Sequence, residues 1–281
     1  MNNGGKGSAT NGGGGAGTAR SGAGRSPAKP GLGAEIAKLT AVPRSASTRE
    51  FLTMDWNYPV YTPPQAERTN GTSAVAARHA LSREEAIRFI AGSDPRPLLV
   101  LRECPVCNKT DDALLKGGAD NERTLILARW FHCVKLPVDV VEDDHPFNAL
   151  FPDNESEHLF LALADGSERV PLESEGSRTE LWTGMSRILA SAYEKDPSGS
   201  FGDIVKRFDK LDELEAKLLD LEVRRSAETE ATRPDRQKVE QLDQEMQDVK
   251  SRIGAEKATI ERMRTVPLKR KPAPEPAPAA K

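Results

Sequence analysis

The pattern of apolar and polar positions changes twice along the chain. Between about residues 80 and 195, short apolar runs alternate with amphipathic segments, which is typical of strands and helices that share one core. Two capping sequences, Ser82–Glu85 and Ser177–Glu180, stand directly before apolar residues at helical spacing and predict helix starts. From about residue 203 to 264 the apolar residues repeat at heptad spacing instead, which predicts long helices.

The apolar runs of the central part predict four strands, at residues 97–102, 132–141, 158–164 and 168–172. Asp165-Gly166, between the last two, is a hairpin turn signal. In the second run Val134 and Leu136 alternate onto one face, and Pro137 inside the run predicts an edge strand. Helices are predicted between and around these strands, at 82–91, 107–116, 120–131, 146–151 and 177–193.

Composition indicates one globular part within a longer, uneven chain. Of the 281 residues, 37% are hydrophobic, 30% are charged and only 5% are aromatic, which is low for a single globule of this length. Residues 1–33 hold 12 of the 22 glycines and no acidic residue, so we expect disorder there. The predicted segments are a disordered Gly-rich arm (1–45), an irregular arm with aromatic residues and prolines (46–80), a globular domain (81–196), coiled-coil helices (203–264, with a break near 226–233) and a Pro/Ala-rich tail (265–281).

Cys104-Pro105-Val106-Cys107 is the one motif whose spacing implies chemistry. It stands where the buried strand predicted at 97–102 ends and the polar helix predicted at 107–116 begins. The free N–H groups and the dipole at a helix N-terminus favour the thiolate, which is the reactive form of cysteine. The motif therefore predicts a reactive thiol at Cys104.

The order of elements around this motif resembles the thioredoxin-like family over about residues 82–195. The resemblance implies a three-layer α/β/α domain with a mixed sheet, whose strand at 132–141 lies at an edge. It also implies a thiol–disulfide oxidoreductase that needs no cofactor, in which Cys104 attacks a disulfide of a protein substrate and Cys107 resolves the mixed disulfide. Two intervening residues let both sulfurs meet at disulfide distance across one helical turn.

Two positions depart from the family pattern. Glu157 stands at or near the place where family members usually carry a cis-proline. Glu103 precedes Cys104 where an aromatic residue is common, and its carboxylate opposes thiolate formation, which the neighbouring Arg102 would offset. These departures keep a second function open, a catalytically degenerate thioredoxin-like scaffold or adaptor that oligomerises or binds partners through its coiled coil.

Other functional classes have less support in the sequence. A zinc site usually needs two cysteine pairs, but the only further cysteine is Cys133, beside His132, and His79, His145 and His158 are scattered. We therefore predict neither a metal nor a cofactor. The formal net charge of −3 argues against a nucleic-acid partner. Because no signal-peptide core and no run of 18 apolar residues occurs, we expect a cytoplasmic protein without a membrane partner.

The heptad region carries two apolar positions, occupied for example by Leu211 and Leu218 and by Leu214 and Leu221. Polar residues fill the seam in the middle, and Pro234 follows, so two helices are predicted, at about 204–226 and 233–264. They fold back as a hairpin within one chain or pair between chains as a coiled coil. The expected partners are thus protein thiols or disulfides at the cysteines, and a second copy or another helix here.

Overall fold

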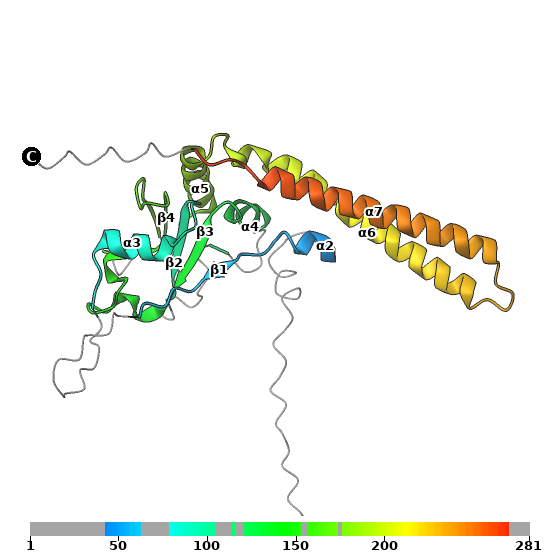
Figure 1. Ribbon diagram of the computed structural model, residues 1–281, viewed down its shortest axis with the longest axis horizontal. Helices are drawn as coiled ribbons and strands as arrows, with labels where there is room; N and C mark the ends of the chain where they lie inside the picture. The colour runs from blue at the N-terminus through cyan, green and yellow to red at the C-terminus, as the bar shows by residue number, and fades with distance from the viewer. Residues whose placement is uncertain are drawn as a thin grey trace, which may run out of the picture.

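The centre of the fold is a five-stranded mixed sheet of order β1-β3-β2-β4-β5 (Figure 1). The computed structural model describes residues 43–62, 79–104, 114–115, 121–152, 157–173 and 176–269. β1, β3 and β2 run parallel to one another, and β4 lies antiparallel to both β2 and β5. The predicted α/β class with a mixed sheet is therefore confirmed. The strands are β1 (Trp56–Asn57), β2 (Leu98–Arg102), β3 (His132–Leu136), β4 (Glu157–Ala162) and β5 (Val170–Glu173).

Local sequence signals account for several helix boundaries. Ser82 and Ser177 each accept a hydrogen bond from the backbone N–H three residues later, and the glutamate there bonds back to the serine N–H, so both predicted capping boxes are confirmed. The described α-helices are α2 (Ala46–Arg49), α3 (Arg83–Ala91), α4 (Glu122–Ala128), α5 (Arg178–Ala192), α6 (Phe201–Thr229) and α7 (Arg236–Arg264). Short 3-10 helices lie at Val138–Val141, Asn148–Leu150 and Pro197–Ser200.

The centre of the sheet is covered on both faces, which explains why all five residues of β2 are buried. On one face Leu99 and Leu101 join a core with α4, α5 and the near ends of α6 and α7. On the other face Leu98 and Val100 join a second core formed with α3 and residues 147–151. Strands covered on two sides read as continuous apolar runs, as β2 does.

The predicted strand at 132–141 is wrong in two respects. β3 ends at Leu136, and Pro137 instead precedes a 3-10 helix at Val138–Val141, because proline cannot donate a hydrogen bond to the sheet. The strand is also not at the edge, since β1 pairs with it on the outer side.

Three predicted segment boundaries also need correction. The arm predicted as irregular at 46–80 contains α2 and supplies the edge strand β1. The Gly-rich arm was expected to extend to residue 45, but Arg44 is buried. In the predicted tail, Leu268 forms a β-bridge with Tyr193, and Val266 and Leu268 pack against the main core. Much of the predicted Gly-rich arm (1–42), the end of the aromatic arm (63–78), most of the helix after Cys104 (105–113) and most of the tail (270–281) lie outside the described residues.

α6 and α7 fold back on each other as a hairpin, which extends well away from the sheet (Figure 1). Asp235 caps α7 by accepting hydrogen bonds from the N–H groups of Gln237 and Lys238. The two helices start and end within a few residues of the predicted positions. Of the two arrangements left open by the sequence, the one within a single chain is present; pairing between chains stays a prediction.

Candidate functional site

The predicted reactive cysteine lies at the end of the sheet where the parallel strands β2 and β3 terminate, which we call the carboxyl edge. β4 begins at this edge because it is antiparallel to β2, with Leu101 opposite Leu159. Cys104 follows β2 by two residues, is half-buried, and is in the disulfide form. Cys107 and the helix predicted at 107–116 lie outside the described residues, apart from Leu114 and Leu115, so the Cys104–Cys107 pairing stays a prediction.

A lysine from the neighbouring strand compensates the carboxylate beside Cys104. The backbone N–H of Glu103 donates to the carbonyl of Leu136 at 2.9 Å, which extends the β2–β3 pairing by one residue. Lys135 Nζ lies 3.6 Å from Glu103 Oε1, and the Lys135 side chain is largely buried. Arg102, the cation expected from the sequence to offset Glu103, donates from Nε to the Glu157 carbonyl at 2.9 Å.

Glu157, at the first position of β4, is a buried carboxylate in an ion pair with Arg169. Arg169 also donates to the Leu150 carbonyl at 2.9 Å, and its guanidinium lies 4.5 Å from the centre of the Phe160 ring. Burial lowers the pKa of Arg169, and the attraction of Glu157 only partly offsets this. A paired carboxylate therefore lies at or near the place where the family resemblance leads one to expect a cis-proline, and the described residues contain no cis peptide bond.

His158 adds a group that prefers to be neutral. It is buried, and burial together with the nearby Arg102 lowers the pKa of its imidazole. A low-dielectric site next to a cation disfavours a second positive charge. The start of β4 thus brings Arg102 to the Glu157 backbone and Arg169 to the Glu157 carboxylate, beside a histidine whose pKa is lowered.

A second charged cluster lies at the N-terminus of α4. This helix leads from the carboxyl edge of the sheet back to the start of β3, so its N-terminus lies on the same side as Cys104. There the buried Arg44 binds Glu122 at 2.7 Å, Asp209 at 2.6 Å and Asp212 at 2.8 Å. Burial opposes the charge of Arg44, but these three carboxylates outweigh it and raise the pKa of the guanidinium.

The remaining cysteine and histidines do not gather into a site within the described ranges. Cys133 is buried in the main core, its thiol lies 3.5 Å from the Ala128 carbonyl, and burial raises its pKa to about 12. This is the packing role expected for a small residue in a sheet. No group of three or more His, Cys, Asp or Glu side chains suited to a metal occurs in the part of the chain that the structure describes.

Sequence reasoning missed Lys135, Arg169 and Arg44 as neighbours of this edge. Lys135 is a polar residue flanked by the apolar Val134 and Leu136, and this contrast was the only local signal for it. Arg169 and Arg44 lie in polar stretches where nothing distinguishes them from exposed arginines. Their roles come from partners 12 and 78 residues away, which periodicity within a segment does not report.

No family model, curated protein or solved structure was found to match the chain. None of the described helices is both long and apolar enough to cross a membrane.

Proposed function

We propose that the chain is a thioredoxin-like thiol–disulfide oxidoreductase that exchanges a Cys104–Cys107 pair with protein substrates. The observation that carries the proposal is the position of Cys104, half-buried and in the disulfide form directly after the central strand β2. The order β2-α4-β3 followed by the antiparallel pair β4-β5 and then α5 supports the thioredoxin-like assignment.

The exchange balances within the two cysteines and the substrate. The Cys104 thiolate attacks one sulfur of the substrate disulfide, so a Cys104–substrate disulfide forms and the other substrate sulfur leaves as a thiolate. The Cys107 thiolate then attacks the Cys104 sulfur and releases the reduced substrate. Two electrons pass to the substrate, and a dithiol reductant must return them to the pair.

The charges at the edge favour the first step. A thiolate beside an unpaired carboxylate would be disfavoured, because like charges raise a thiol pKa. Lys135 Nζ lies 3.6 Å from Glu103 Oε1, and its positive charge opposes that repulsion. We assign to Lys135 the role of a positioning residue, which acts on Cys104 through Glu103.

The test is a pair of measurements on the full-length protein. In glutathione buffers of graded poise, thiol trapping and mass spectrometry should find a reversible Cys104–Cys107 disulfide at a potential roughly between −120 and −270 mV. Reduction of insulin by dithiothreitol should be accelerated by the protein and lose that acceleration in Cys104→Ser. Cys133→Ser is the matched control and should keep full activity. Unchanged turnover in Cys104→Ser, or no disulfide at any poise, would rule the proposal out.

A second function is favoured by the ion pair of Glu157 with Arg169 and by the extended hairpin. In this alternative the domain is a scaffold or adaptor whose hairpin binds a helical partner or a second copy. It predicts that removing residues 203–264 changes the molar mass in solution or abolishes a partner interaction. The same glutathione titration separates the two, because an adaptor needs no exchangeable disulfide.

A further inference from the structure

One stripe of α6 is covered by the chain near the sheet and uncovered toward the tip of the hairpin. Residues spaced by three or four positions share a helix face, and one such face of α6 carries in order Phe208, Asp212, Glu215, Leu219 and Val223. The first three contact the segment that begins at Pro43. Leu219 and Val223, further along, are 63% and 61% exposed.

Residues 44–51 hold the covered half through specific contacts. The Ser45 N–H donates to Asp212 at 2.9 Å, and the Ser47 N–H donates to Glu215 at 3.1 Å. The Thr48 hydroxyl donates to Asp212 at 2.7 Å, and the Phe51 ring lies 5.9 Å from that of Phe208. The described chain therefore starts directly on this stripe.

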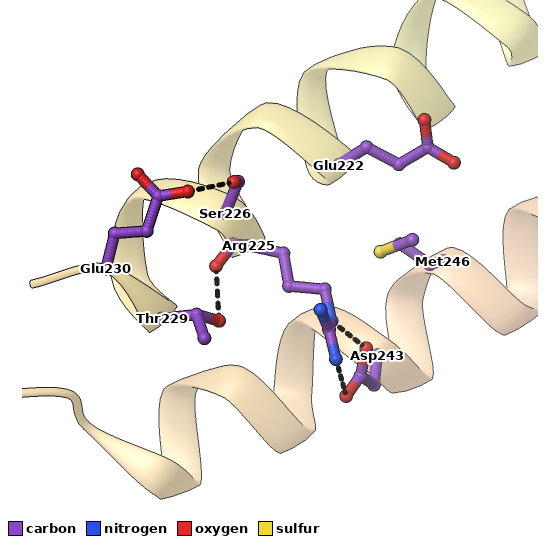
Figure 2. A pocket seen from close by; sticks show the side chains of 7 residues that line it. All are labelled: Glu222, Arg225, Ser226, Thr229, Glu230, Asp243 and Met246. Atoms are coloured by element: carbon purple, nitrogen blue, oxygen red, sulfur yellow. Dashed lines mark hydrogen bonds and ion pairs between the residues drawn. The ribbon is translucent and has the colours of Figure 1, made fainter.

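The uncovered half has a definite chemistry, apolar in the middle and acidic around it. Glu222, Ser226 and Glu230 continue the same face beside Leu219 and Val223. Figure 2 shows the neighbouring pocket between the helices, where Ser226 donates to Glu230, and Arg225 reaches across to Asp243 of α7. Arg225 is paired with Asp243, so its charge is directed to α7 and away from Glu222 and Glu230. An occupant should present apolar residues together with lysine or arginine.

We propose that residues 34–42 of the same chain cover Leu219 and Val223. In this segment Ile36, Leu39 and Val42 recur every three residues, and the charges of Glu35 and Lys38 cancel. The complementary basic charge comes from residues 1–33 before it, which carry lysine and arginine but no acidic residue. Nine residues span roughly 13 Å as a helix or about 30 Å when extended. Leu219 and Val223 lie about 10 and 16 Å beyond Asp212 along the helix, so the segment reaches both from Pro43.

The coverage extends the contacts of residues 44–51 by two helical turns. Burying two aliphatic side chains removes an exposed apolar patch from a helix that is otherwise charged on its outer side. The N-terminal arm and the hairpin then form one unit, in a way that does not depend on the oxidoreductase activity.

Photo-crosslinking tests the placement in the full-length protein. Benzoylphenylalanine replaces Leu219 in one variant and Lys217, on the opposite side of α6, in a matched control. Equal amounts of ordinary and ¹⁵N-labelled protein are mixed before irradiation, so that peptide masses separate links within one chain from links between chains. We expect the probe at 219 to attach to residues 34–42 of its own chain, and the probe at 217 to leave them unmarked.

A companion variant keeps the result interpretable. Ile36→Asp with Leu39→Asp should abolish the link from position 219 without changing the helix content by circular dichroism. Links from 219 to a second copy, to any other segment, or to nothing would overturn the proposal. Equal labelling of residues 34–42 from 217 would overturn it as well, because it would show contact without a preferred face.

Discussion

The near and far halves of the α6–α7 hairpin differ in what surrounds them, although both follow one heptad pattern. In the near half Ile204, Phe208, Leu211 and Ile260 belong to the main core beneath the sheet. In the far half Leu214, Leu221, Leu242 and Val249 contact mainly each other and a few partly buried neighbours on the same two helices. The same repeat thus builds a layer of a domain in one half and a free-standing pair of helices in the other.

The charges of the two halves differ in the same way. Arg44 and Glu122 are buried together where α4, α6 and the N-terminal segment meet. The pair of Arg225 with Asp243 near the tip is about half exposed. Exposed pairs contribute little to stability, whereas breaking a buried pair is costly. The hairpin is therefore anchored to the domain by the first turns of α6 and the last turns of α7, whereas contacts between the two helices hold its far half together.

The largest effect should come from Arg44→Met, which removes the cation shared by three carboxylates. It would leave the buried Glu122 without its guanidinium partner, so we expect a loss of about 3–5 kcal/mol in the free energy of unfolding. The matched control, Arg225→Met, should change the free energy of unfolding far less, because water screens the pair that Arg225 forms with Asp243. Urea unfolding of both variants at pH 7 measures the difference. Equal losses would show that the anchor does not depend on the buried charges.

The next effect separates the two apolar clusters. Leu211→Ala opens a cavity in the main core and should lower the free energy of unfolding by about 2–5 kcal/mol. Leu221→Ala removes a contact that only the two helices share, so the tip should open locally while the domain stays folded. Hydrogen exchange followed by mass spectrometry should then show faster exchange confined to the tip in Leu221→Ala. Faster exchange across the sheet in that variant would contradict the division into two halves.

The sequence predicted those features that residues within a few positions of each other determine. The caps at Ser82 and Ser177, the buried strand β2 and the two long helices all depend on such local patterns. β1 was missed because two residues form a strand only through pairing with β3. The end of β3 was predicted too late, because a proline inside an apolar run is compatible both with an edge strand and with a strand that has just ended.

The candidate site shows the same limit more strongly. The motif at Cys104 was visible because both cysteines lie within four residues. Lys135 reaches this end of the sheet from a strand about 30 residues further along, and only the register of the sheet brings it beside Glu103. Neither an apolar repeat nor a motif carries that register.

The smallest effect concerns Asp212, and it should depend on pH. Burial alone would raise the pKa of this carboxyl, but hydrogen bonds from Arg44, Thr48 and Ser45 outweigh it and lower the pKa below its usual value. The folded state therefore binds the proton less readily than the unfolded state, in which the pKa of an aspartate is about 3.9. Asp212 thus contributes stability above about pH 4, and this contribution is lost as the pH falls through the lowered pKa.

Asp212→Asn tests this linkage, because the amide keeps an acceptor for Ser45 but carries no charge. The variant should be less stable than the parent protein at pH 7, and the gap should narrow below about pH 4. Asp220→Asn, on an exposed turn of α6, is the control and should show little change at either pH. Guanidinium unfolding curves at pH 7, 5, 4 and 3 measure both variants. A gap that stays constant across this series would mean that Asp212 acts through hydrogen-bond geometry alone, and the contrast between the near and far halves would then rest on Arg44 and the apolar core.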